Sequence, residues 1–145
     1  SGPAGLLYSP SFIKRELFPQ VKKILNRLKE KGYKVIYDFE GDNREVLDLM
    51  VKDGADASTP VEEISGVDIE EIKKKYPGLV LGFMIDSINL LTNGSSDDVI
   101  KKTKDIVRIA RDYGGILIGS SGTLHNEIPV ENILAMTDAV KNIRF

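Results

Sequence analysis

The sequence of 145 residues contains no cysteine and no tryptophan, and only one histidine. Without cysteine the chain cannot form a disulfide bond, a thiolate metal ligand or a cysteine nucleophile. Because a single histidine is too few for a usual zinc site, we expect no bound metal ion and no cofactor. The lack of disulfides suits a reducing compartment, and we expect the protein to be cytoplasmic.

Long hydrophobic runs are also lacking, since none approaches the roughly 18 residues that a membrane-spanning helix needs. The first residues lack the basic and hydrophobic regions of a signal peptide, so we expect no membrane partner and a chain cut from a longer protein. Lysine and arginine number 20 and aspartate and glutamate 22, which gives a net charge of −2. Because domains that neutralise many phosphates are usually basic, we expect no nucleic-acid partner.

Four short hydrophobic segments are present, and they alternate with helical patterns. We predict strands at 33–39, 55–58, 79–85 and 115–119. Strands that recur with a helix between them are typical of parallel strands joined by right-handed crossovers. The pattern predicts an α/β fold, with residues 1–145 in a single domain.

The predicted helices have recognisable ends. Pro19 is expected to interrupt the first helix, and Gly32 is expected to end the second. A clear amphipathic helix is predicted up to Tyr113, and a closing helix at 131–140. Residues that suit helix N-caps precede several helices: Ser9, Asp42, Asp68 and Ser95.

Several segments follow one another in an order typical of one protein family. They are LYSPSF (7–12), LFP (17–19), VIYDFEGD (35–42), GADA (54–57), VDI and KKKY (67–76), LLTNG and DV (90–99), GGIL (114–117) and IPVENILAM (128–136). In these segments the chain resembles the uroporphyrinogen decarboxylase family, which also contains methylcobamide:coenzyme M methyltransferases and related corrinoid-dependent demethylation enzymes. The resemblance implies a (β/α) barrel of the TIM type, of which this chain would supply about four C-terminal βα units of eight.

In such barrels the active site lies at the carboxyl ends of the strands. The ends expected here are 37–40, 58–59, 84–87 and 120–123. The carboxylates Asp38, Glu40 and Asp86 are our candidates for general acid–base catalysis or for binding pyrrole N–H groups. Their alternative role is to cap helices or to face solvent. The residues expected to contact a substrate are Tyr37, Phe39, Arg44, Met84 and Ser121.

The family's own catalytic markers are replaced in this sequence. In the zinc-dependent branch, the resemblance places a His-x-Cys pair at Tyr37 and Phe39, and a cysteine near Ser120 or Ser121. The decarboxylase branch has a Gly-His-Gly turn where this chain has GSSG at 119–122. His125 follows closely, and it either takes over a catalytic role or is an exposed loop histidine.

The resemblance implies a parent enzyme that decarboxylates a tetrapyrrole or takes part in corrinoid-linked methyl transfer. Its substrate would be a tetrapyrrole or a corrinoid protein. The strand ends are acidic, and because arginine is the residue that pairs bidentately with carboxylates, they suit a polycarboxylate poorly. The alternative is a catalytically inactive half-barrel that acts as a structural or oligomerising subunit.

Four strands taken from a closed barrel leave two sheet edges unpaired. We expect the inward side chains to be Val35, Tyr37, Phe39, Leu81, Phe83 and either Ile116 or Leu117. An apolar face of this kind normally marks an interface. We therefore expect the partner to be the absent N-terminal half or a second copy of the chain, unless the helix at 10–31 folds across the open face.

Overall fold

The computed structural model describes residues 8–39, 42, 44–61, 63 and 66–141. The described part of the chain has three consecutive helical segments near its start, α1 (Pro10–Phe12), the π-helix η1 (Ile13–Leu17) and α2 (Phe18–Glu30). Strands and helices then alternate: β1 (Ile36–Asp38), α3 (Arg44–Lys52), β2 (Ala57–Thr59), α4 (Ile69–Lys75), β3 (Val80–Gly82), the π-helix η3 (Ser87–Thr92), α5 (Ser96–Tyr113), β4 (Ile116–Leu117) and α6 (Val130–Lys141).

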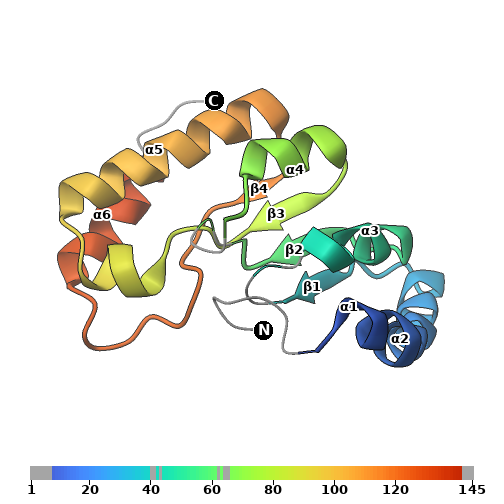
Figure 1. The fold of residues 1–145 in the computed structure, drawn as a ribbon. Coiled ribbons are helices and arrows are strands. Elements are labelled where there is room, and N and C mark those ends of the chain that lie inside the picture. Colours follow the sequence, from blue (N-terminus) through green and yellow to red (C-terminus); the bar gives the residue numbers. More distant parts are fainter. Residues whose placement is uncertain (1–7, 40–41, 43, 62, 64–65, 142–145) are drawn as a thin grey trace.

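The four strands form one parallel sheet in the order β1-β2-β3-β4. Helices α2, α3, α4 and α5 follow one another around the outside of this sheet (Figure 1). The sequence prediction of sequential parallel strands is therefore confirmed. The regular strands are shorter than the predicted segments, although an isolated parallel bridge between Ile85 and Ser120 continues the β3–β4 pairing toward the carboxyl ends.

The two faces of the sheet differ from our expectation. Tyr37 is level with Ser58 and Leu81, and its ring stacks on Phe18 of α2 at a centroid distance of 6.3 Å. Leu81 is completely buried in the same core. The face predicted to point into the barrel is thus the one that the helices cover. Hydrophobic residues occur on both faces of a parallel strand, so the sequence pattern alone does not distinguish the two faces.

The opposite face carries Ile36, Asp38, Thr59, Gly82 and Leu117, which share one side of the pleat by their register. Ile36 is 55% exposed and Leu117 is 41% exposed. The helix at the N-terminus does not fold across this face, because Phe18 packs on the other one. This face, called the inner face below, would line the interior of a closed barrel.

Pro19 does not interrupt the helical path as predicted. Ser9 caps α1 by accepting a hydrogen bond from the Phe12 backbone N–H, and Pro10 takes the first helical position. The backbone then widens into the π-helix η1, and Pro19 lies in the first turn of α2. Because proline has no N–H to donate, it fits a helix start without the loss of a hydrogen bond.

The helix ends near α5 follow the predicted capping pattern. Ser95 accepts a hydrogen bond from the Asp98 N–H, and the Asp98 carboxylate accepts one from the Ser95 N–H, which makes a capping box. Asp68 caps α4 through the Glu71 N–H at 3.1 Å. The buried side chains of α3, α4, α5 and α6 join one continuous core cluster with those of the sheet.

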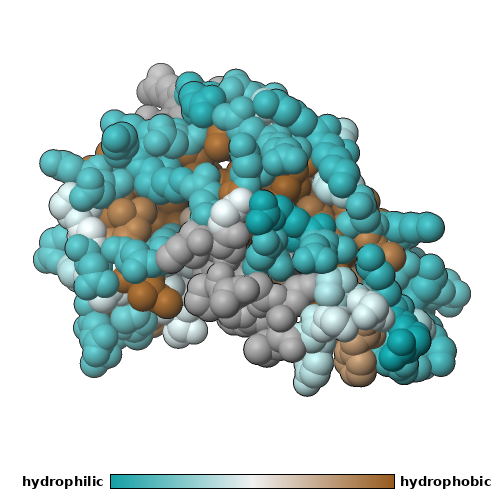
Figure 2. Space-filling view, viewed as in Figure 1, coloured by the Kyte–Doolittle hydropathy of each residue, from teal (hydrophilic) through white to brown (hydrophobic). Residues whose placement is uncertain are grey.

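The outer surface over these helices is predominantly hydrophilic, with hydrophobic side chains visible between the helices (Figure 2). Within the described ranges, no helix combines the length and the apolar character needed to cross a lipid bilayer.

Candidate functional site

A hollow of about 400 Å³ lies at the carboxyl ends of the four strands. Each strand contributes to its lining through its last residue or through the loop that follows. The lining residues are Asp38, Pro60, Phe83, Gly119, Ser120, Ser121, Gly122 and Thr123. We call this set the mouth hollow. The carboxyl ends of parallel strands are the usual position of active sites in β/α barrels, so this is the candidate site.

Phe83 occupies this hollow with an unusual backbone conformation. Its φ of +56° lies in the left-handed region, which residues other than glycine rarely adopt. Its ring lies against Gly119, where an added Cβ would stand 2.9 Å from Phe83 Cδ1. Phe83 N–H donates to the Leu117 carbonyl, and the residue is 41% exposed. Gly119 therefore makes room for an aromatic face at the surface of the hollow.

The serine loop after β4 is fixed by its own hydrogen bonds. The Ser120 hydroxyl donates to the Gly122 carbonyl at 2.8 Å. The Ser121 N–H donates to the Ile85 carbonyl, and Ser121 Oγ accepts from the Ser87 N–H at 3.3 Å. The Ser120 hydroxyl hydrogen is thus used within the loop, and Ser120 and Ser121 both belong to the lining of the hollow.

The predicted carboxylates have different environments. Asp38 is exposed at the hollow, and among the described residues it makes no hydrogen bond and no ion pair. Asp86 instead caps η3, where it accepts hydrogen bonds from the Ile88 and Asn89 backbone N–H groups, both at 2.8 Å. This is the capping alternative considered from the sequence. Glu40 lies outside the described residues.

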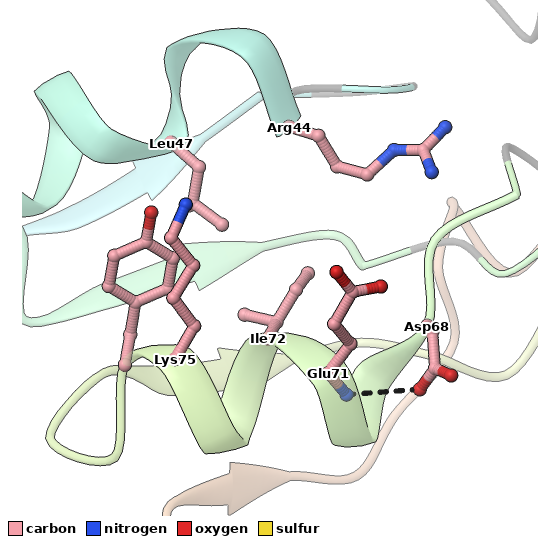
Figure 3. Close-up of a pocket in the computed structure, with 7 residues that line it drawn as sticks. Arg44, Leu47, Asp68, Glu71, Ile72 and Lys75 are labelled. Carbon is pink, nitrogen blue, oxygen red and sulfur yellow. Dashed lines mark hydrogen bonds between the residues drawn. The ribbon is translucent and has the colours of Figure 1, made fainter.

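Arg44 is turned away from the mouth hollow. It lines a small groove between α3 and α4, together with Leu47, Asp68, Glu71, Ile72, Lys75 and Tyr76. In Figure 3 its guanidinium lies on the side of the groove nearest Glu71 and Asp68. It donates to both carboxylate oxygens of Asp42, at 2.9 and 2.6 Å. The guanidinium is therefore not free to bind a carboxylate of a substrate. The same hydrogen bonds lower the pKa of Asp42 and raise the pKa of Arg44.

The remaining predicted contacts are spread over the fold. Tyr37 and Phe39 pack toward the core, and Met84 is buried in it. His125 is an exposed residue of the loop between β4 and α6. Of the eight predicted residues that the structure describes, only Asp38 and Ser121 lie together in the lining of the mouth hollow.

The positions that would correspond to zinc ligands do not fit a zinc ion. The ring of Tyr37 stacks on Phe18 on the helix side of the sheet, away from the mouth hollow. The Ser121 hydroxyl is neutral and accepts a hydrogen bond from the Ser87 N–H, whereas zinc prefers thiolate, imidazole or carboxylate ligands. Within the described part of the chain, no group of three or more histidine, aspartate or glutamate side chains is arranged to hold a metal.

Sequence reasoning did not assign Pro60, Phe83 and Gly119 to the site. Phe83 was expected only as an apolar inward residue, and no local motif marks its left-handed backbone. The one available signal was its place after a hydrophobic strand, since residues there lie at the mouth of a barrel.

Comparison with solved structures identifies the same architecture in a larger protein. A structure described as a methyltransferase from Methanosarcina mazei superposes with a TM-score of 0.76 at 20% sequence identity. The match covers 93% of this chain and 38% of that one, so the chain spans well under half of its length. No curated protein sequence matches the chain. The sequence profile of the family described as Uroporphyrinogen decarboxylase (URO-D) matches residues 4–143, and the chain therefore belongs to the uroporphyrinogen decarboxylase family.

Proposed function

We propose that this chain forms the C-terminal part of the substrate-binding mouth of a methyl-transferring member of the family. The observation that carries the proposal is the chemistry of the mouth hollow. It is lined by one unpaired carboxylate, three hydroxyl groups and an aromatic ring. Such a lining attracts a cationic methyl donor, accommodates a neutral one and repels a substrate with many carboxylates.

Decarboxylation of a polycarboxylate tetrapyrrole is less well supported. Carboxylate groups on a substrate call for arginine clamps, because guanidinium pairs with carboxylate bidentately. Arg44, the arginine nearest to the strand ends in the sequence, pairs with Asp42 and faces the groove between α3 and α4. The described residues of the mouth hollow instead supply negative charge through Asp38.

The proposal is tested with the polypeptide that contains this chain. It is incubated with methylated donors and a reduced corrinoid protein, and methylation of the corrinoid is followed by its absorbance. In parallel, release of carbon dioxide from uroporphyrinogen is measured. We expect corrinoid methylation, with a rate lowered at least about tenfold by Asp38→Asn, and no carbon dioxide. Decarboxylation without methylation would refute the proposal.

A second candidate function is a structural half-barrel that pairs with another copy or with the N-terminal half of a barrel. Ile36 and Leu117 favour it, because both are exposed on the inner face, which would be packed in a closed barrel. The mass of the protein in solution, measured by light scattering at micromolar concentration, tests self-pairing. A mass near 16.0 kDa, that of one chain, would contradict it.

A further inference from the structure

We propose that the mouth hollow binds a methylated onium cation, an ammonium or sulfonium group that carries methyl substituents. The inference rests on the proposed function, since it names the chemical class of the methyl donor. It is drawn from three features of the hollow: its unpaired carboxylate, its exposed aromatic face and the hydrogen bond that the Ser120 hydroxyl donates within its own loop.

The carboxylate of Asp38 supplies the charge. It lies at the end of β1 on the inner face, and no described residue neutralises it. Several other carboxylates of the chain have cationic neighbours, such as the partly buried Glu70 with Arg108 at 3.0 Å. A carboxylate left unpaired beside a concave surface is a suitable counter-ion for a cationic ligand.

Phe83 supplies an aromatic face. Methylated ammonium groups are held over aromatic rings because the ring carries negative charge on its faces. The ring is presented at the hollow by the left-handed backbone of Phe83 and by the close approach that Gly119 permits. This conformation is unfavourable for any residue other than glycine. Backbone outliers of this kind cluster at ligand sites.

The Ser120 hydroxyl favours a cation over an anion. The hydrogen of the Ser120 hydroxyl is used within the loop, where it is donated to the Gly122 carbonyl. The Ser120 oxygen remains as an acceptor in the lining of the hollow, and it complements the polarised methyl groups of an onium ion. The volume of about 400 Å³ lies within the usual range of small-molecule sites, roughly 300–1,000 Å³.

The experiment measures binding to the chain itself, without methyl transfer. Choline is titrated against labelled protein and followed by amide chemical shifts, alongside its uncharged analogue in which carbon replaces nitrogen. Trimethylsulfonium forms a second arm, which distinguishes sulfonium from ammonium donors. We expect the amide chemical shifts of Phe83 and of residues 119–122 to change on binding. Choline should bind at least about fivefold more tightly than the uncharged analogue.

Four variants decide which groups act. Phe83→Leu and Asp38→Asn should each weaken choline binding about two- to fivefold, the range for a cation–π contact at an exposed site. Phe83→Tyr keeps the aromatic face and should keep the affinity. Tyr33→Leu removes an exposed aromatic ring elsewhere and should change nothing. Circular dichroism checks that each variant is folded.

The inference is overturned if neither cation binds at tens of millimolar, or if the uncharged analogue binds as well as choline. It is also overturned if Phe83→Leu and Asp38→Asn bind choline like the unchanged chain. Its failure is distinguishable from that of the proposed function. Corrinoid methylation from a neutral donor would leave methyl transfer standing, whereas choline binding without methyl transfer would leave only the onium site.

Discussion

Tyr37 has a hydroxyl group that the fold buries without a hydrogen-bond partner among the described residues. Burial, with a smaller contribution from the negative charge of Asp53, raises the pKa of Tyr37 to about 12. The ring nevertheless packs well, since it stacks on Phe18. The aromatic ring therefore stabilises the fold, while the unpaired hydroxyl destabilises it.

We predict that Tyr37→Phe raises the free energy of unfolding by about 1 kcal/mol, because it removes an unsatisfied polar group and keeps the ring. The measurement is urea unfolding of both proteins followed by circular dichroism. Tyr33→Phe is the matched control at an exposed site, and it should have no effect. A loss of stability in Tyr37→Phe would mean that the hydroxyl has a partner, such as a bound water.

Asp56 joins the end of α2 to the start of the sheet. Its carboxylate forms a hydrogen-bonded ion pair with Lys29. It also accepts hydrogen bonds from the Val35 N–H at 2.7 Å and from the Lys34 ammonium group at 3.2 Å. The bond to Lys29 is the largest of the effects that lower the pKa of Asp56, to about 2. The folded chain thus holds this carboxylate in its charged form.

We predict that Asp56→Asn lowers the free energy of unfolding by about 1–2 kcal/mol at neutral pH. Since the folded pKa is lower than that of the unfolded chain, the stabilisation is complete above pH ~4 and is lost as the pH falls toward ~2. Urea unfolding at several pH values should therefore show the two proteins converging in acid. Asp105→Asn, on the exposed side of α5, is the control. A difference that stays constant down to pH ~2 would contradict the assignment.

At the scale of elements, Asn132 attaches α6 to the end of η3. It is 3% exposed, and its amide donates to the carbonyls of Leu91 and Gly94, both at 2.9 Å. Its own carbonyl accepts from the Ser96 hydroxyl at the start of α5. One side chain thus satisfies three polar groups where η3, α5 and α6 meet. These three hydrogen bonds give a physical reason for an asparagine at position 132 of the IPVENILAM segment.

We predict that Asn132→Ala lowers the free energy of unfolding by about 2–3 kcal/mol, because it leaves buried carbonyl groups unpaired. Thermal and urea unfolding measure the effect, and hydrogen exchange should show faster opening of α6 than of α3. Asn126→Ala, in the exposed loop before α6, is the matched control. Equal stability of Asn132→Ala and the unchanged chain would show that water replaces the amide without cost.

At the scale of the whole molecule, one sheet face is packed and the other is partly uncovered. Helices bury Leu81 and Ser58, whereas Ile36 and Leu117 remain exposed on the inner face at the two outer strands. In a closed barrel this face would be filled by side chains of all eight strands. This partly uncovered face is the surface on which we propose that a second half-barrel packs.

We predict that Ile36→Lys reduces self-association of the chain, because it places a charge on the inner face. Light scattering over a concentration series measures the mass of each protein. Ile24→Lys is the matched control, since Ile24 is 62% exposed on α2. Equal association of the two variants would place the contact elsewhere on the molecule.

The sequence alone determined the order and type of the elements. Alternation of hydrophobic segments with amphipathic helices predicted four parallel strands, and the capping residues Asp68 and Ser95 predicted where α4 and α5 begin. These signals are local, because capping and periodicity depend on residues only a few positions apart. The family resemblance likewise depended on segments read in order along the chain.

Only the tertiary structure decided which side chains meet at the mouth hollow. Val35, Tyr37 and Phe39 were correctly placed together by the period of two, but packing on Phe18 turned them to the helices and left Asp38 at the hollow. A parallel strand is apolar on both faces, so the choice between faces is made by the helix that packs on it. The left-handed backbone of Phe83, whose ring lies against Gly119 of the next strand's loop, is likewise decided by a neighbour in space.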